Sequence, residues 1–524
     1  MTSEHASLAF ALGGAQGASS GLGPKIGDVV ERLDLEKAWL VDPVSGQEGP
    51  GEIVVVDGVL ESVNWLEGAE ADGVTADGVV VAPGFFDLHA HFREPGFEDA
   101  ETVASGCAAA AHGGYTAVAL MPNTSPALDS PGVYQLIRAA AAASGSPIAV
   151  HAYGAVSASR SGEQLSAMGE LADAGVLGFS DDGAPVKTPR LLRSALIYAG
   201  MLGLPVVEHA EDTEMTAGAE AHEGYVASVM GLAGWPTAAE VNAISRDIAV
   251  LADALGDEPR ARLHLTHVST AAGLELVRAA RARGLPVTCD VTPHHLALTD
   301  EWIAGSRRWA WEALAGDPAA RSRDPEPRSG DAAARSRDPE PRSGDAWADG
   351  VLTAGPYDTS LRVNPPLATP DDAAACLAAL IDGTASAVAT DHAPHTIVDK
   401  EVEFGKASNG ISGIETALGI LLSLVDAGKL PLVAAIRALT SGPASIVAGW
   451  PGTAASPAAR PRGLIEGATA DLVVFDRSDR WPVTAATLKS KGKNSPLLGR
   501  DLPGRVILTI AAGKLAYEDP TAGE

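Results

Sequence analysis

The stretch from Gly84 to Glu94, GFFDLHAHFRE, contains residue types that could hold a metal ion. His89 and His91 stand two apart after an apolar run, so on a β-strand they point to one face, together with Asp87 and Arg93. Burying two imidazoles and a guanidinium side by side costs free energy unless each has a partner. The stretch therefore indicates the first half of a metal centre.

Four further candidate ligands follow other apolar runs: Asp182, His209, His267 and Asp391. Each has an ordinary alternative: a hydrogen-bonded core histidine, an aspartate that begins a turn, or one that caps a helix. Four imidazoles and two carboxylates suit borderline divalent metals such as zinc. Their number favours two ions, held about 3.5 to 4 Å apart.

The elements that must position these residues are predicted to be parallel strands. Apolar strand candidates recur roughly every thirty to forty residues, with alanine-rich helical segments between them, which is typical of repeated βα units. A TIM-type (β/α)8 barrel carries its chemistry at the C-terminal ends of its strands. All six candidate ligands fall at such ends, an arrangement that six independent structural roles would not produce. The predicted strands are VVAPGFFDLHAH, YTAVALMPN, PIAVHAYGA, VLGFSDDG, LPVVEHAE, RLHLTHVS, LPVTCDVTPHH and SAVATDHAPH.

The two ends of the chain have a different pattern. Short β-rich pieces separated by Gly, Asp and Pro fill residues 28–82 and return in residues 446–524. We expect these two parts to meet as one small β-sandwich domain, with the barrel occupying residues 83–445.

Two segments are predicted to be disordered. Residues 1–27 have an acidic residue where a signal peptide requires Lys or Arg, which favours a plain extension over a secretory signal. Residues 317–348 contain the sequence AARSRDPEPRSGDA twice, at 319–332 and 333–346. This repeat has no apolar face to offset its ordering entropy, although a peptide-binding or regulatory role is the alternative.

Composition excludes several classes of function. The net charge of −29 disfavours nucleic acid or an anionic membrane as a partner. No uncharged apolar run reaches the roughly 18 residues of a membrane span. The three scattered cysteines, Cys107, Cys289 and Cys376, predict no disulfide and a reducing compartment, so we expect a cytoplasmic protein.

Several stretches together resemble the dihydroorotases of the amidohydrolase superfamily, specifically the bacterial monofunctional type. The resemblance runs from about Leu33 to Tyr517, without the repeat. The Arg two residues after the H-x-H pair and the MPNT stretch are its most specific parts. The matching stretches are PGFFDLHAHFREPG, GGYTAVALMPNTSP, GFSDDGAPV, HAED, LTHVST, VTPHHL, VNPPL, ATDHAPHT, GISGIET and SKGKNSP.

The resemblance implies a role for each ligand. His89, His91 and Asp391 would hold one zinc ion, and His209 and His267 the other. Asp182 would bridge the two ions, with Asp181 as the alternative bridge. Asp391 would act as general base and acid, taking a proton from a zinc-activated hydroxide and passing it to the leaving ring nitrogen. In reverse, the site would cyclise N-carbamoyl-L-aspartate to (S)-dihydroorotate plus water, in de novo pyrimidine biosynthesis.

The substrate carboxylate needs a cationic partner. Arg93 offers a bidentate fork beside the metals, with Asn123 next to it, although a surface ion pair with Glu94 or Glu98 is the alternative for Arg93. The resemblance adds His91 and His395, and it assigns the ring amide edges to Asn364 and the backbone around Asn409 and Gly410. The sequence KASNGISG lacks the proline that is usual before this last stretch. We expect Asp87 to hydrogen-bond a ligand histidine, and His294 and His295 to be structural or loop-positioning residues.

Two alternatives stay open. One is another cyclic amidase of the same fold, a hydantoinase or allantoinase, against which Arg93, Asn123 and an aspartate bridge argue. The other is a non-catalytic scaffold that binds aspartate transcarbamoylase. The sequence leaves open a homodimer, and also a complex of an active enzyme with aspartate transcarbamoylase.

Overall fold

The computed structural model describes residues 25–314, 355–454 and 456–521. The tandem repeat at 319–346 lies outside the described residues, as does the predicted N-terminal extension up to residue 24. None of the helices within the described ranges is both long and apolar enough to cross a membrane.

Eight parallel strand paths form the barrel that the sequence predicts. β7 and β8 are separated by Tyr153 alone and act as one path, and a parallel bridge between Ala90 and His392 closes the ring from the last strand to the first. Each neighbouring pair is parallel. The strands are β5 (Phe85–Ala90), β6 (Tyr115–Leu120), β7 (Ala149–Ala152), β8 (Gly154–Ala155), β9 (Phe179–Ser180), β10 (Val206–Glu208), β13 (Leu263–Leu265), β14 (Val287–Val291) and β15 (Ala387–Val388).

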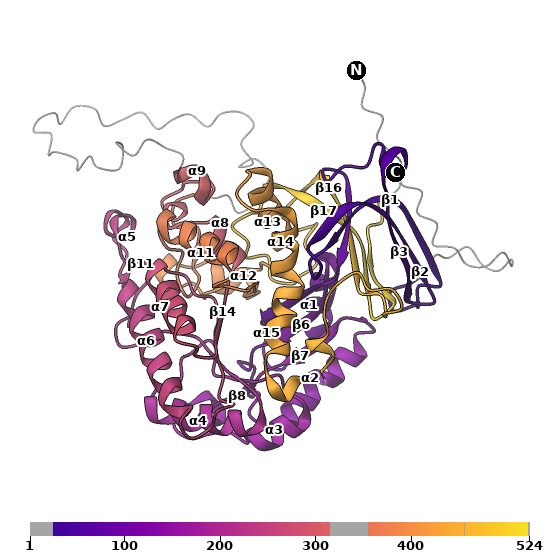
Figure 1. The fold of residues 1–524 in the computed structure, drawn as a ribbon. Coiled ribbons are helices and arrows are strands. Elements are labelled where there is room, and N and C mark those ends of the chain that lie inside the picture. Colours follow the sequence, from indigo (N-terminus) through magenta and orange to yellow (C-terminus); the bar gives the residue numbers. More distant parts are fainter. Residues whose placement is uncertain (1–24, 315–354, 455, 522–524) are drawn as a thin grey trace, which may run out of the picture.

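Helices surround these strands (Figure 1). Several begin in the same way: Thr102, Thr188, Thr270 and Thr369 each accept the amide hydrogen three residues later, which satisfies one free donor of the first turn. The helices are α1 (Val103–His112), α2 (Pro131–Ala143), α3 (Met168–Ala174), α4 (Pro189–Leu202), α5 (Tyr225–Met230), α6 (Thr237–Ala254), α7 (Ala271–Ala282), α8 (Pro293–Ala297), α9 (Ala310–Leu314), α11 (Pro370–Asp382), α12 (Ile397–Lys400), α13 (Ala417–Asp426), α14 (Leu432–Leu439) and α15 (Ser441–Ala448). A small pair, β11 (Ala221–His222) and β12 (Gly234–Trp235), lies beside α5 and α6 in the sequence.

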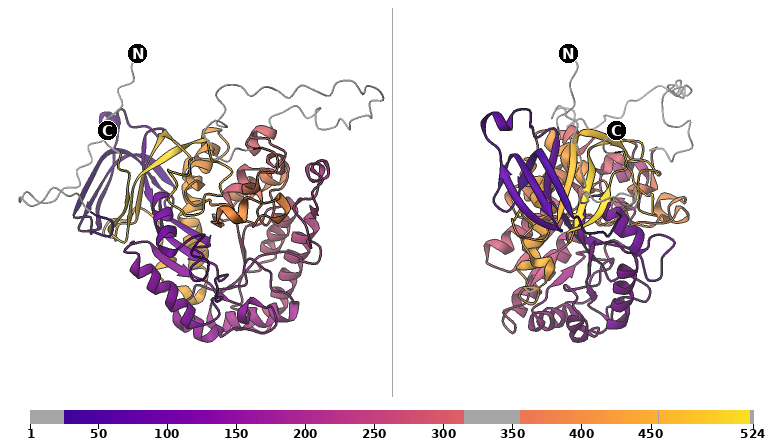
Figure 2. Two further views of the ribbon diagram at one scale, coloured as in Figure 1. Left: turned by 180° about the vertical axis from the view of Figure 1, so that it is seen from behind. Right: turned by 90° about the vertical axis from the view of Figure 1, so that its right-hand side faces the viewer.

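The two ends of the chain meet in one seven-stranded sheet, as predicted. Its order is β18-β17-β16-β4-β1-β2-β3, and the views in Figures 1 and 2 show the indigo strands beside the yellow ones. Isolated bridges join each outer strand to a segment before an inner strand: Val59 of β3 to Thr469 before β16, and Lys514 of β18 to Val29 before β1. The strands share an apolar core. The strands are β1 (Arg32–Asp42), β2 (Gln47–Val56), β3 (Val59–Trp65), β4 (Val79–Pro83), β16 (Leu472–Pro482), β17 (Asp501–Ala511) and β18 (Lys514–Glu518).

The sheet and the barrel are joined where β4 passes directly into β5. Gly84 lies between them, and a Cβ atom there would come within 2.2 Å of the Thr116 side chain. Only glycine permits this close approach of two strands. The strand that carries His89 is therefore anchored in the sheet.

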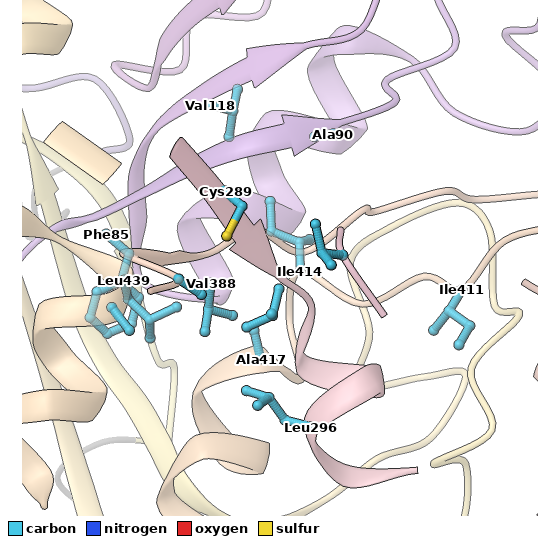
Figure 3. Close-up of a cluster of buried hydrophobic side chains, with 14 of the residues drawn as sticks. Phe85, Ala90, Val118, Cys289, Leu296, Val388, Ile411, Ile414, Ala417 and Leu439 are labelled. Carbon is cyan, nitrogen blue, oxygen red and sulfur yellow. The ribbon is translucent and has the colours of Figure 1, made fainter. Parts of the chain in front are cut away.

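Apolar side chains fill both sides of the barrel wall. Phe86, Leu88, Ala117, Ala119 and Val207 share one cluster, and Phe86 pairs with Ala117 across neighbouring strands, so these residues fill the barrel interior below the strand ends. A second cluster lies between strands and helices. Figure 3 shows part of it, with Phe85, Cys289, Val388, Ile414 and Leu439 labelled.

The helix α15 bears on where the barrel ends. It spans the predicted boundary between residues 445 and 446, and it contacts both β5 and β15. We propose that the barrel segment extends through this helix, with the second part of the sheet domain beginning after it.

Candidate metal centre

His89, His91 and Asp391 meet at the C-terminal end of the barrel. His91 Nε2 lies 3.1 Å from both His89 Nε2 and Asp391 Oδ1, and His89 Nε2 lies 3.4 Å from Asp391 Oδ1. All three side chains are buried. Their ligand atoms converge closely enough to hold one metal ion.

The carboxylate of Asp182 faces two pairs of histidines at once. Its Oδ2 atom lies 3.3 Å from His89 Nε2, whereas its Oδ1 atom lies 3.4 Å from His267 Nε2 and 3.6 Å from His209 Nδ1. His209 Nδ1 and His267 Nε2 are themselves 3.1 Å apart. One oxygen toward each pair is the arrangement that a carboxylate bridging two cations requires.

Asp181, the alternative bridge, is engaged elsewhere. Its two carboxylate oxygens accept hydrogen bonds from the backbone amide of Ser157, at 3.0 Å, and from the Ser157 hydroxyl, at 2.5 Å. The structure therefore brings Asp182, and not Asp181, to the histidines.

Three residues behind the ligands were missed by the sequence reasoning. The Nδ1 atom of His89 lies 2.8 Å from the Thr266 hydroxyl, and that hydroxyl lies 3.3 Å from Asp290. Asp290 also accepts the backbone amide hydrogen of His267 at 2.7 Å and contacts His264 Nε2 at 2.8 Å. This series of hydrogen bonds holds the His89 ring so that Nε2 faces the other candidate ligands. A hydrogen bond to the second ring nitrogen orients metal-binding histidines in this way.

Glu211 plays a similar part for His209. Its Oε2 atom lies 2.9 Å from His209 Nε2 and accepts a hydrogen bond from Asn364 Nδ2, also at 2.9 Å. The Thr216 hydroxyl donates to its other oxygen. The carboxylate thus leaves His209 Nδ1 available for a metal and connects this candidate ligand to Asn364.

Asp87 hydrogen-bonds the candidate ligand His89, as expected, although through the backbone and not through the imidazole. Its carboxylate accepts hydrogen bonds from the backbone amides of His89 and Thr390 and from the Thr390 hydroxyl, and the imidazole of His89 is held by Thr266 instead. A bulge explains this, because the register of β5 against β6 shifts between Asp87 and Ala90. Asp87 ties the first strand to the last.

The electrostatics of this group of residues favour bound cations. Burial lowers the pKa of His89, but Asp182 and Asp391 outweigh burial and raise it to about 9; Asp182 and Glu211 in the same way raise the pKa of His209 to about 10. The histidines hold the pKa of Asp182 and of Asp391 well below the usual range despite burial. Imidazole nitrogens and carboxylate oxygens in this buried arrangement form a donor set that fits borderline divalent metals.

Three residues of the site have left-handed backbone angles. The φ values are 60° at Arg93, 41° at His267 and 47° at Asp391. Such angles cost about 1–3 kcal/mol each in non-glycine residues and persist only where surrounding contacts impose them. Here the backbone turns as each strand ends, which re-aims the side chain.

Arg93 lies beside the ligands and is not the surface ion pair that the alternative required. Glu94 and Glu98 accept backbone amide hydrogens of Val103 and Gly96, and within the described residues no carboxylate lies at ion-pair distance from the Arg93 guanidinium. Burial lowers the pKa of Arg93, to about 10. Its Nε–H donates to the Pro394 carbonyl at 3.1 Å.

Asn123 is positioned by His91, one of the candidate metal ligands. Its Oδ1 atom accepts a hydrogen bond from His91 Nδ1 at 2.8 Å, which leaves the amide nitrogen as a donor. The role of this amide as a substrate donor beside Arg93 stays a prediction.

His395, Asn409 and Gly410 are linked to one another. His395 Nε2 donates to the Asn409 carbonyl at 2.8 Å, and the Gly410 amide donates to the Arg362 carbonyl at 2.9 Å. The Gly410 carbonyl accepts from Asn494 Nδ2 at 2.9 Å. These groups would have to exchange protein partners for ligand in order to bind a substrate ring, a requirement that the sequence did not indicate.

His295 has the loop-positioning contacts that were expected. Its Nδ1 atom lies 2.9 Å from the Thr292 hydroxyl and its Nε2 atom lies 3.1 Å from the Pro365 carbonyl, next to Asn364. His294 is buried against it, with ring centres 4.6 Å apart.

Comparison with known proteins gives a consistent result. A family model described as Dihydro-orotase-like matches residues 78–272. The dihydroorotase of Anaeromyxobacter dehalogenans strain 2CP-1 is 41% identical over 492 residues, covering 94% of this chain and 99% of that protein. The dihydroorotase of Pelotomaculum thermopropionicum is 38% identical over 493 residues, with 93% and 99% covered. The chain belongs to the dihydroorotase family.

Solved structures similar to this dihydroorotase-family chain include hydantoinases. The L-hydantoinase from Arthrobacter aurescens matches with a TM-score of 0.68 and 22% identity over 93% of this chain and 96% of its own. A D-hydantoinase from Thermus sp. matches with a TM-score of 0.65 and 21% identity, over 94% and 96%. At this identity the likeness shows a shared fold alone. The family is metal-dependent, and the convergent His and Asp groups could hold the metal.

Proposed function

We propose that this chain catalyses the reversible cyclisation of N-carbamoyl-L-aspartate to (S)-dihydroorotate and water. The observation that carries the proposal is the cluster of four histidines and two aspartates, with Arg93, which has no carboxylate partner among the described residues, at its edge. Relatives named dihydroorotase along nearly the whole chain support it. The step belongs to de novo pyrimidine biosynthesis.

The metal assignment is part of the proposal. His89, His91 and Asp391 would hold one zinc ion, His209 and His267 a second, and Asp182 would contact both. The division of the Asp182 oxygens between the two pairs of histidines supports two ions. Such a pair of cations supplies a hydroxide nucleophile at neutral pH and polarises the ring carbonyl under attack.

Asp391 would move the proton. Its carboxylate is buried and stays ionised, since the neighbouring histidines hold its pKa low. It can therefore take the proton of the attacking water and deliver it to the ring nitrogen as the carbon–nitrogen bond breaks. For ring closure, the same carboxylate would accept the nitrogen's proton and return it to the leaving water.

The substrate contacts are proposed from the hydrogen-bonding groups that surround the candidate metal ligands. Arg93 would bind the substrate carboxylate, because its guanidinium has no carboxylate partner among the described residues. The Asn123 amide would donate beside it, and His91 and His395 would complete this side. Asn364, Asn409 and Gly410 would contact the amide edges of the ring.

We also infer the wider setting. The acidic net charge, the buried free cysteines and a small-molecule substrate agree with a cytoplasmic enzyme. A homodimer or a complex with aspartate transcarbamoylase is compatible with this proposal and would be measured by light scattering of the purified chain, alone and with the transcarbamoylase.

The decisive experiment combines metal analysis with a dihydroorotate ring-opening assay. Purified protein is expected to contain about two zinc ions per chain and to open dihydroorotate. Asp391→Asn should lower kcat by a factor of about 10² to 10⁴. Arg93→Ala should mainly raise KM, since it removes the carboxylate's partner.

Several outcomes would refute the proposal. Activity on hydantoin or allantoin without activity on dihydroorotate would assign a different cyclic amidase. A metal-free, inactive protein that co-elutes with aspartate transcarbamoylase would assign a scaffold. A fully active Asp391→Asn variant would refute the role of this carboxylate.

A further inference from the structure

Lys400 is a buried cation whose partners are all backbone carbonyls. It ends α12 and is 4% exposed. Its ammonium donates to the carbonyls of Ser408 at 2.5 Å, Thr359 at 3.0 Å and Arg362 at 3.3 Å. Among the described residues no carboxylate lies within ion-pair distance of it, and burial lowers its pKa to about 7.

The burial of this ammonium is not explained by packing alone. Lysine is almost never fully buried, and a charge without an opposite partner is costly in the interior. An apolar side chain of similar length would fill the same volume without that cost. The three carbonyls, by contrast, require donors, and an ammonium supplies three from one point.

The three carbonyls belong to segments that carry proposed substrate contacts. Thr359 and Arg362 lie on the segment that leads to Asn364, and Ser408 directly precedes Asn409 and Gly410. Lys400 itself lies five residues after His395 on the remaining segment. One ammonium therefore ties together the three chain segments on this side of the site.

Further hydrogen bonds connect the same segments. Arg362 Nε donates to Asn409 Oδ1 at 2.9 Å, and Arg362 NH1 donates to the Phe404 carbonyl at 2.9 Å. The Thr359 hydroxyl donates to the carbonyl of Lys400 itself at 2.6 Å. Lys400 is the buried centre of this network, whereas Asn409 is exposed at its edge.

We propose that Lys400 is a positioning residue that assembles the substrate-binding side of the site, by holding the segments of Asn364, His395 and Asn409 in one arrangement. The inference rests on the proposed function, because the expected change in KM is for dihydroorotate. It does not place Lys400 in contact with substrate or metal, so its removal should affect substrate binding more than the chemical step.

The test is Lys400→Met, which keeps the length of the side chain and removes all three donors. Its KM for dihydroorotate should rise at least tenfold, with kcat within threefold of wild type and with unchanged metal content. The matched control is Lys406→Met, since Lys406 is exposed nearby and its ion pair in the described part of the chain is with Glu403 on the surface. Its KM should stay within twofold of wild type.

Amide hydrogen exchange gives a second readout that does not depend on turnover. Exchange in residues 359–364 and 406–411 should be faster in Lys400→Met and unchanged in Lys406→Met. If the methionine variant does not fold, Lys400→Gln, which keeps two donors, should show the same two effects to a smaller degree.

The outcomes separate the two hypotheses. A wild type without dihydroorotate turnover would refute the proposed function, and the exchange measurement would then decide on Lys400 by itself. Unchanged KM and unchanged exchange in Lys400→Met would overturn the inference. Equal losses of kcat and metal content would also overturn it, because they would show a general structural role.

Discussion

Glu211→Gln tests whether metal binding and substrate binding share one carboxylate. Glu211 lies 2.9 Å from both His209 Nε2 and Asn364 Nδ2. Both contacts use the same oxygen, Oε2, so a glutamine can offer them at most one neutral acceptor in place of a charged one, with its amide nitrogen facing the Thr216 hydroxyl. The candidate metal ligand and the proposed substrate contact should therefore both keep only a weaker acceptor.

The magnitude follows from two independent sources. Burial raises the pKa of Glu211, but its hydrogen bonds with His209 and its other partners lower it overall to about 2. Relative to the ordinary value of 4.5, this is a preference for the ionised form of about 3 kcal/mol. Loss of an acceptor behind a metal-binding histidine typically weakens metal affinity about 10- to 100-fold, or about 1.4 to 3 kcal/mol. The free energy derived from the pKa of Glu211 is the upper limit of the expected loss.

The assay is competition with a chelator, followed by kinetics at saturating zinc. Glu211→Gln should lose metal about 10- to 100-fold more readily than wild type, and its KM should rise through Asn364 even when metal is restored. Glu214→Gln is the matched control, since Glu214 is exposed on the same loop. Wild-type metal affinity together with wild-type KM in Glu211→Gln would refute the reasoning.

Two further predictions concern stability. In metal-stripped protein, the raised pKa values of His89 and His209 stabilise the fold below their unfolded pKa of about 6.5, and this contribution is lost as pH rises toward about 9 to 10. The melting temperature of the stripped protein should therefore fall between pH 6.5 and 10, and a flat profile in calorimetry would contradict this. Asn494→Ala removes hydrogen bonds to His395, Ser412, Ala393 and Gly410 and should lower the free energy of unfolding by about 3 kcal/mol in urea titrations. Asn64→Ala, at an exposed strand position, should change it by less than about 0.5 kcal/mol, and equal effects would refute the argument.

The strand ends were predictable because their pattern is local. Apolar runs that end in His or Asp indicate both the barrel and the residues that converge at its strand ends, so His89, His209 and Asp391 could be selected from sequence as candidate ligands. The choice between Asp181 and Asp182 could not be made in that way, since it depends on Ser157, a residue on a neighbouring strand path.

Residues behind the site were missed for a related reason. Thr266 and Asp290 act together only because β13 and β14 pair in a particular register, with Leu265 opposite Cys289. The convergence of three carbonyls on Lys400 leaves no side-chain pattern at all. Sequence reasoning finds residues that belong to a local motif. It misses residues that come together only through tertiary contacts.

The passage of β4 into β5 has a consequence for how the molecule is made. β4 pairs with β16, which is synthesised almost four hundred residues later. Until β16 is made, β4 lacks this partner, and β4 leads directly into β5, the strand that carries His89. Asn494, which hydrogen-bonds the carbonyls of Ala393 and Gly410, is also not yet made. Contacts so distant in sequence form slowly. A nascent chain would thus acquire the barrel before it acquires a fixed site, and catalytic competence would arrive with the last strands.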